Sequence, residues 1–261
     1  MRILMIGDVI GRPGRRALSA VVPELRRQEQ LDFVVANGEN SAGGRGLTVE
    51  TAEEMLASGV DVITSGNHVF RQQKDIIPYL EMDVPVLRPL NYPQGVPGRG
   101  HVVIKTASGA QVMVVNLCGR VNLMDLDSPF QRVHRLFRDF ASMPPVVLVD
   151  FHAETTSEKQ AMGWFLDGRV SAVVGTHTHV PTADTRLLNN RTAYVSDLGM
   201  VGPYNSILGD RIEPIMSHFL TQMPARFEVG DGPVVFNSVL IEVDDTGRAR
   251  SIHRTDRIVE D

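Results

Sequence analysis

The chain has 261 residues, of which 43% are apolar and 22% charged, so it can bury a substantial core and is expected to form one domain over residues 1–261. Its formal net charge of −5 argues against a protein that follows nucleic-acid phosphates, because such proteins usually carry a dominant basic patch. Cys118 is the only cysteine, which excludes an intramolecular disulfide and a thiolate metal cluster. We therefore expect no stable nucleic-acid partner and a reducing compartment.

The sequence also argues against a membrane protein. No stretch approaches the roughly 18 uninterrupted apolar residues of a membrane helix. The apolar run at the N-terminus is interrupted by Asp8, and no small-residue cleavage site follows it. We expect a cytoplasmic protein.

Short apolar runs alternate with helical spacings along most of the chain. The runs are rich in β-branched residues and predict buried strands at residues 3–6, 33–36, 62–64, 146–149 and 170–174. Apolar residues at helical spacing predict helices at residues 15–28, 48–58, 130–141 and 157–166. Pro23 is expected to bend or restart the first helix, and Thr48 and Gly59 are expected to begin and end the second.

Two further regions are rich in β-branched residues. Residues 101–106 and 111–117 flank an Ala-Ser-Gly-Ala turn and predict a hairpin, and residues 234–243 and 250–254 form a second β block. Mixed strands with helices outside them predict an α/β fold of two packed sheets covered by helices on both sides. Residues 197–210, rich in glycine, predict either a substrate loop or a plain surface connection.

Side chains that bind metal ions follow each of the five predicted buried strands. In chain order they are Asp8, then Glu39 and Asn40, then Asn67 and His68, then His152, and finally His177 and His179. In open α/β sheets the ligand lies beyond the carboxyl ends of the strands. This set of nitrogen and oxygen donors has the size and softness to hold two divalent metal ions.

Each of these signals is weak when taken alone. An aspartate such as Asp8 after a strand is more often a turn or helix-cap residue, and a His-x-His pair such as His177 and His179 is often a surface feature. The sequence Gly66-Asn67-His68 is more specific, because the asparagine oxygen is a rare but suitable ligand. Their co-occurrence in one order, each at a strand end, is what indicates a metal centre.

Other polar residues carry less information. The remaining histidines lack metal spacing and are expected to be surface or packing residues: His101, His134, His218 and His253. Arg45 lies in a glycine-rich segment, residues 42–46. Either its guanidinium and the neighbouring amides bind a substrate phosphate, or the segment is a flexible loop.

The ordered set of blocks resembles the calcineurin-like metallophosphoesterase family. The blocks are Gly-Asp, a bridging acid, Gly-Asn-His, a single histidine and His-x-His, between Asp8 and His179. Two positions depart from the common pattern, since Ile10 stands where that family has a histidine and Glu39 where it has an aspartate. With the sequences ANGENSAGG and DFHAE, this variant resembles the bacterial YmdB-type phosphodiesterases.

The resemblance implies a four-layer αββα fold, two metal ions and hydrolysis of 2′,3′- and 3′,5′-cyclic nucleotides. By the same resemblance, Asp8, Glu39, Asn40 and His179 would hold metal one, and Glu39, Asn67, His152 and His177 would hold metal two. Asn40 would replace the ligand lost at Ile10. Iron, manganese and zinc all accept these donors, with iron or manganese favoured. His68 would donate a proton to the leaving oxygen, or else orient a ligand.

Other function classes stay open at this point. The same site would suit a phosphomonoesterase or nucleotidase, or a metal-dependent regulator that senses nucleotides or RNA with little turnover. A metal amidohydrolase is disfavoured, because it would normally place His-x-His on an early strand. The preferred ester and the formation of a homo-oligomer are not readable from the sequence.

Overall fold

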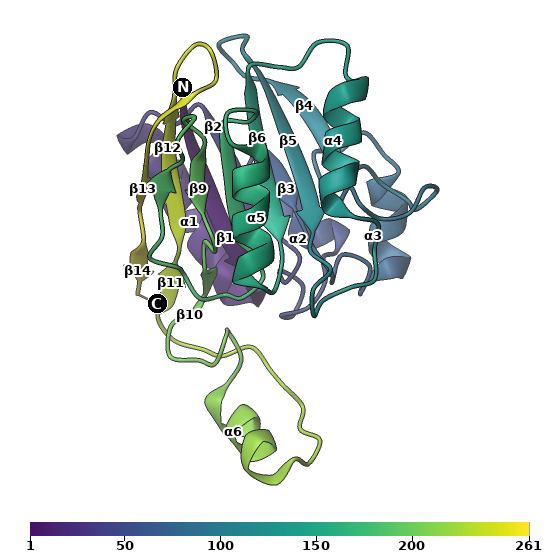
Figure 1. Ribbon diagram of the computed structural model, residues 1–261. Coiled ribbons are helices and arrows are strands. Elements are labelled where there is room, and N and C mark those ends of the chain that lie inside the picture. Colours follow the sequence, from purple (N-terminus) through teal and green to yellow (C-terminus); the bar gives the residue numbers. More distant parts are fainter. Residues whose placement is uncertain (261) are drawn as a thin grey trace.

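The computed structural model describes residues 1–260, which form two β-sheets with helices around them (Figure 1). The strands of the first sheet are β1 (Arg2–Val9), β2 (Phe33–Asn37), β3 (Val62–Thr64), β10 (Met200–Pro203), β11 (Val234–Phe236), β12 (Ser238–Val243), β13 (Ala249–Arg254) and β14 (Arg257–Val259). They run in the order β13, β12, β1, β10, β11 and β14, with β2 beside β1 and β3 beside β2. The long strand β1 is therefore the centre of this sheet.

The second sheet consists of β4 (His101–Lys105), β5 (Gln111–Cys118), β6 (Val146–His152), β7 (Ala172–Thr176), β8 (Arg186–Leu187) and β9 (Ala193–Val195). Their order is β4, β5, β6, β7, β9 and β8. The antiparallel pair β4 and β5 confirms the predicted hairpin, and β5, β6, β7 and β9 are parallel neighbours. The sheet is mixed, as expected from the alternation of strands and helices.

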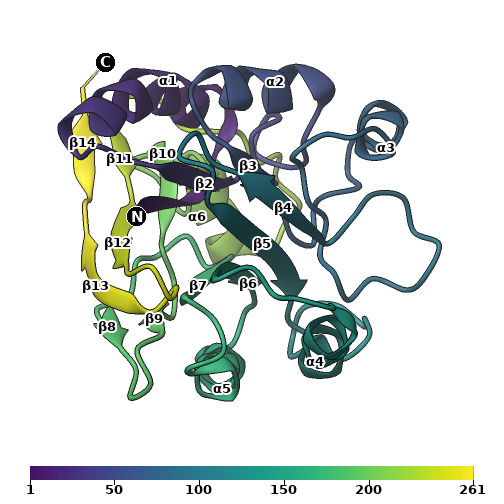
Figure 2. The same ribbon diagram turned by 90° about the horizontal axis from the view of Figure 1, so that it is seen from above.

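Helices cover the outer faces of both sheets. Helices α1 (Gly11–Gln28), α2 (Val49–Ala57) and α3 (Gln73–Leu80) lie on the first sheet, and α4 (Pro129–Asp139) and α5 (Thr156–Leu166) lie on the second (Figure 2). Helix α6 (Ile212–Thr221) lies apart from both layers (Figure 1). The predicted αββα arrangement is confirmed. Within residues 1–260, no helix combines the length and hydropathy that a bilayer-crossing segment needs.

The space between the sheets is filled by apolar side chains from both. Met5 and Val35 from the first sheet join Val114, Leu148 and Val174 from the second in one buried cluster. Alternate residues of each strand face the helices instead and form two outer clusters. Because β1, β2 and β3 are parallel, and β5, β6 and β7 likewise, several carboxyl strand ends meet at one edge of the sandwich.

Helix α1 differs from its prediction. It begins at Gly11 and continues through Pro23 to Gln28, so of the two expected effects of the proline, a bend or a restart, the restart is wrong. The buried face of the helix includes Leu18 and Val22 before the proline and Leu25 after it. Packing of this face stabilises the helix on both sides of the residue that cannot donate a backbone hydrogen bond. Helix α2 follows the prediction, with Thr48 as its N-cap.

The predicted loop at residues 197–210 and the predicted β block at residues 234–243 are also organised differently. Buried strand β10 interrupts the loop and pairs with β1 and β11. The block divides at Asn237, whose side-chain oxygen accepts from Met200 N at 3.2 Å and whose carbonyl accepts from Gly7 N at 3.1 Å. The chain thus changes its neighbour from β10 to β1 at this one residue.

A substitution in the layer between the sheets should test how far the fold depends on it. Leu148 is fully buried, so Leu148→Ala is expected to lower the free energy of unfolding by about 2–5 kcal/mol, because it leaves a cavity. Urea denaturation followed by circular dichroism measures the change. The exposed Met82→Ala serves as control. A Leu148→Ala variant as stable as the control would contradict the packing described here.

Candidate metal centre

All of the metal-binding side chains expected from the sequence come from segments at the carboxyl edge of the two sheets. Asp8 lies near the end of β1, and the other first-sheet members follow β2 and β3. His152 is the last residue of β6, and His177 follows β7 directly. The candidate site therefore spans both sheets, with contributions from each.

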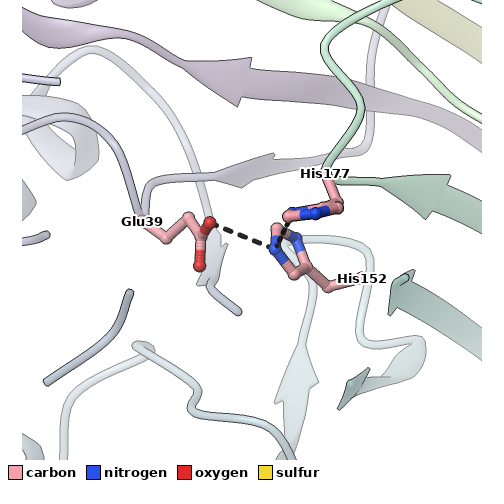
Figure 3. Close-up of side chains that lie close together, drawn as sticks. All are labelled: Glu39, His152 and His177. Atoms are coloured by element: carbon pink, nitrogen blue, oxygen red, sulfur yellow. Dashed lines mark hydrogen bonds and ion pairs between the residues drawn. The ribbon is translucent and has the colours of Figure 1, made fainter. Parts of the chain in front are cut away.

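Three donor atoms gather around His152 Nε2, which makes a cluster of four. Its Nε2 lies 2.9 Å from Asn67 Oδ1, 3.1 Å from His177 Nδ1 and 3.1 Å from Glu39 Oε1. Figure 3 shows Glu39, His152 and His177 converging from different segments. Ligands of a first-row metal ion at about 2.0–2.2 Å lie about 3 Å from one another, so these spacings fit one ion. The four residues are those expected to hold metal two.

The residues expected at metal one are less tightly gathered. His179 Nε2 lies 3.9 Å from Asp8 Oδ1 and 3.2 Å from Asn40 Nδ2. The Asn40 oxygen instead lies 3.0 Å from His68 Nδ1. A ligand role for Asn40 requires the amide to turn by half a rotation, which exchanges two atoms of similar size. His179 Nδ1 contacts the Leu208 carbonyl at 2.8 Å, which leaves Nε2 facing Asp8.

Two buried acidic residues at the centre of the site indicate that the site can bind a cation. Asp8 and Glu39 are fully buried, and within the described residues Asp8 Oδ1 and Glu39 Oε1 accept no hydrogen bond of good geometry, although His152 Nε2 lies 3.1 Å from Glu39 Oε1. Such unpartnered, buried carboxylate oxygens are costly unless a positive charge or a donor compensates them. Their position beside imidazole nitrogens fits a metal ion well.

The pKa values of the site residues reflect their burial and the short distances between their charged groups. Burial raises the pKa of Asp8 to about 6, against the opposing attraction of His179 and His152. Burial is the largest single influence on Glu39 and His152 and opposes their charged forms, but it is outweighed by their mutual attraction together with His68 on Glu39 and with Asp8 and Asp150 on His152. The pKa of the Glu39 carboxyl is therefore lowered and that of the His152 imidazole raised. Burial and the nearby His152 lower the pKa of His177 to about 3. A bound cation would have to displace the proton from His152.

A buried hydrogen-bond network behind His152 was not expected from the sequence. Asp150 accepts hydrogen bonds from Thr176 Oγ1 at 2.7 Å, Thr64 Oγ1 at 2.5 Å and Asn37 Nδ2 at 3.1 Å. Thr176 Oγ1 also lies 3.0 Å from His152 Nδ1. Because the threonine donates to the carboxylate, it accepts from Nδ1, which leaves Nε2 of a neutral imidazole facing the donor cluster. The sequence signal was a carboxylate inside the apolar run of residues 146–151.

The turn that carries His177 and His179 has a strained backbone. The φ angles of the two residues are +104° and +63°, in the left-handed region that side chains rarely adopt. The carboxylate of Asp197 accepts from the Thr178 backbone N at 3.1 Å and pairs with the buried Lys159 at 2.5 Å. These contacts hold the turn in place, with His177 N also donating to Asp8 Oδ2 at 3.0 Å.

The two residues expected to meet the substrate lie at the margin of the cluster. His68 N donates to Glu39 Oε2 at 3.0 Å, and its side chain is partly exposed. Burial lowers the pKa of His68, partly offset by Glu39, and Arg45 is near enough to lower it slightly further. Arg45 itself is exposed and lies 5.8 Å from the centre of the Phe227 ring.

An αββα sandwich with this donor set at its strand ends defines a protein of the metallophosphoesterase class. A family model described as YmdB-like protein matches residues 4–255. The chain belongs to the YmdB-like family. The resemblance of its motifs to that family is thereby confirmed.

Known relatives match nearly the whole chain. A 2′,3′-cyclic-nucleotide 2′-phosphodiesterase from Bacillus subtilis is 47% identical over 97% of this chain and 96% of its own length. A crystal structure of a hypothetical protein from Thermus thermophilus superimposes with a TM-score of 0.93 at 40% identity, covering 99% of this chain and all of the other. The crystal structure of a phosphatase from Mycoplasma pneumoniae also gives 0.93, at 32% identity, covering 100% and 94%.

The hydrogen bond from His152 to Thr176 can be tested apart from the fold. Thr176→Val keeps the shape but removes the acceptor of His152 Nδ1, so the affinity for a divalent metal ion should fall about 10- to 100-fold. Isothermal titration with Mn²⁺ measures this. Thr192→Val is the matched control, because the Thr192 hydroxyl is also buried, donates to Val170 O and accepts from Gly168 N. Equal affinities in the two variants would remove the orienting role of Thr176.

Proposed function

We propose that this protein is a metal-dependent phosphodiesterase that hydrolyses cyclic nucleotides, with 2′,3′-cyclic nucleotides as its main substrates. The observation that carries the proposal is the pair of fully buried carboxylates, Asp8 and Glu39, with unpartnered oxygens beside imidazole nitrogens. The name of the Bacillus subtilis relative supports the choice of ester. The buried carboxylates and the name of this relative together support an enzyme that acts on a small phosphate ester.

The proposed ligands are divided between two ions that share Glu39. Metal one takes Asp8, Glu39, Asn40 and His179, and metal two takes Glu39, Asn67, His152 and His177. The close spacing around His152 Nε2 supports metal two most directly. Nitrogen and oxygen donors without thiolates favour iron or manganese, and they also accept zinc.

When bound, two such ions polarise the phosphoryl oxygens and lower the pKa of a water that attacks phosphorus. The residues supply the rest of the chemistry. Glu39 balances positive charge from the buried centre of the site, where its oxygens are shielded from water. Thr176 keeps His152 Nε2 turned toward the donor cluster. Arg45, exposed at the margin, is proposed to meet a non-bridging phosphate oxygen.

His68 is proposed to protonate the leaving oxygen. Its lowered pKa leaves the imidazole neutral at neutral pH, so the acid form needs a nearby negative charge. A bound phosphodiester brings that charge and raises the pKa of His68 toward the range of a general acid. Asn40 lies against His68 Nδ1, 3.0 Å away, so the other ring nitrogen is left for the substrate. With the Asn40 amide turned for its ligand role, its nitrogen donates to Nδ1 and the proton of a neutral His68 lies on that other nitrogen.

Two other functions share this site. A phosphomonoesterase or nucleotidase would prefer a nucleoside monophosphate to its cyclic ester, and a nucleotide- or RNA-sensing regulator would bind without turnover. Release of nitrophenol from bis(4-nitrophenyl) phosphate, with and without Mn²⁺, separates enzyme from regulator. Rates on a 2′,3′-cyclic nucleotide and on the matching monophosphate separate the two enzymes, and faster release of phosphate from the monophosphate would overturn the proposal.

The cysteine usage supports a reducing compartment, with the cytoplasm as the proposed location. Cys118 is buried, and burial raises the pKa of its thiol well above the ordinary value. Such a thiol is poorly reactive and has no second cysteine in the sequence with which to pair. An oxidising compartment would therefore give this chain no stabilising intramolecular disulfide.

The bridging role of Glu39 predicts a joint loss of metal and activity. Purified wild-type protein should hold close to two metal ions per chain, and Glu39→Gln should lower both occupancy and turnover, because a neutral amide cannot balance two cations. Elemental analysis and hydrolysis of bis(4-nitrophenyl) phosphate measure the two quantities. Glu242→Gln, in β12, is the control. Full metal content with normal turnover in Glu39→Gln would rule out the bridge.

The role of His68 predicts a dependence on the leaving group. His68→Ala should retain both metal ions, while turnover of a 2′,3′-cyclic nucleotide falls by about 10² or more through loss of the acid. A nitrophenyl ester should lose much less, because its leaving group needs little protonation. His134→Ala, an exposed position on α4, is the control. Equal losses on both esters, or loss of metal, would assign His68 to orienting or binding the ions instead.

A further inference from the structure

An acidic residue two positions after His152, in the sequence DFHAE, has no part in the proposed hydrolysis. This residue, Glu154, lies between the end of β6 and Thr155, the N-cap of α5. Its Oε2 lies 2.9 Å from His177 Nε2. The Glu154 side chain is 47% exposed and that of His177 is 18% exposed, so the carboxylate reaches the imidazole from the solvent side of the site.

The two ring nitrogens of His177 face different partners. Nδ1 lies 3.1 Å from His152 Nε2, on the side of the donor cluster (Figure 3), whereas Nε2 lies beside Glu154. A neutral imidazole carries one proton, on either nitrogen, and only the nitrogen without the proton can bind a metal ion. An ionised carboxylate accepts hydrogen bonds and donates none. Its position beside Nε2 therefore favours the tautomer in which Nδ1 is free for an ion.

The other two histidines expected as ligands have an acceptor in the same place. Thr176 Oγ1 lies 3.0 Å from His152 Nδ1, and the Leu208 carbonyl lies 2.8 Å from His179 Nδ1. In both residues the remaining nitrogen, Nε2, faces the other donors of the site. Such acceptors fix the orientation and the tautomer of imidazoles that bind metal ions. Glu154 completes the arrangement for the third ring.

The backbone contacts of the turn do not fix this ring by themselves. His177 N donates to Asp8 and Thr178 N donates to Asp197, and these bonds hold the main chain at a φ of +104° for His177. A half rotation of the imidazole still exchanges the positions of nitrogen and carbon atoms without moving the main chain. A polar partner at the ring itself is needed to select one orientation.

We propose that Glu154 is a positioning residue that accepts a hydrogen bond from His177 Nε2 and thereby keeps Nδ1 directed at metal two. The inference rests on the proposed metal centre, because it takes His177 as a ligand. Since Glu154 and the donor cluster contact opposite nitrogens of the ring, the carboxylate acts through His177 and is not itself a ligand. Its negative charge also makes the imidazole a stronger ligand.

The tautomer of His177 can be measured in the full-length protein without metal. Proton–nitrogen correlation spectra of the histidine rings should place the proton on Nε2 in the wild type, and the signal lost in His177→Gln identifies the residue. Glu154→Gln retains an acceptor oxygen and should keep this tautomer. Glu154→Leu removes the acceptor and should move part of the population to the form protonated on Nδ1. A merely structural role of Glu154 would leave the tautomer unchanged.

Metal affinity gives a second measurement. In isothermal titration with Mn²⁺, Glu154→Leu should bind about 10- to 100-fold more weakly than the wild type, with Glu154→Gln between them. Glu50→Leu, an exposed position in the first turn of α2, is the control and should bind as the wild type does. Thermal unfolding of metal-free Glu154→Leu should match that of the wild type, because a partly exposed ion pair adds little stability.

An unchanged tautomer in Glu154→Leu, or an Mn²⁺ affinity equal to that of the wild type, would overturn the role of Glu154. So would a raised KM for a 2′,3′-cyclic nucleotide with unchanged metal affinity, which would place Glu154 at the substrate instead. The wild type binds Mn²⁺ in each of these cases, so the proposed function would stand. A wild type without affinity for Mn²⁺ would overturn the metal centre itself, and this role with it.

Discussion

Two carboxylates, Asp8 and Glu39, lie fully buried at the edge where the sheets meet, and the arrangement of the site depends on compensating them. Burial in a medium of low polarity makes a negative charge costly, so each acid requires positive charge close by. His152 supplies it in part, which is why the pKa values of Glu39 and His152 shift in opposite directions. The oxygens left without a partner are the positions that a cation would fill.

The same edge explains why metal binding and folding should be coupled. Asp150 joins the ends of four strands, because Thr64 and Asn37 come from the first sheet and Thr176 from the second. A change in sheet packing therefore alters the direction of His152, and a bound ion would in turn hold the sheets together. Buried polar contacts also hold the strained turn at His177: the Asp197 carboxylate accepts from Thr178 N and pairs with the buried Lys159.

The segment between β10 and β11, residues 204–233, connects the site to the outer surface of the molecule. Its Leu208 carbonyl contacts His179 Nδ1 at 2.8 Å, and its Phe227 ring lies under the Arg45 guanidinium at 5.8 Å. The orientation of one expected ligand thus depends on a segment whose apolar face is exposed.

The sequence by itself determined the layers and the identity of the donor residues, because strand periodicity and the order of the Asp, Asn and His blocks are local properties. It did not reveal the Asp150 network, the positive φ of His177 or the division at Asn237, since each depends on which distant strand becomes a neighbour. The continuity of α1 through Pro23 was likewise decided by packing. Contacts between residues far apart in the sequence override local propensity. Only the tertiary structure therefore fixed the orientation of the donor side chains and the position of residues 204–233.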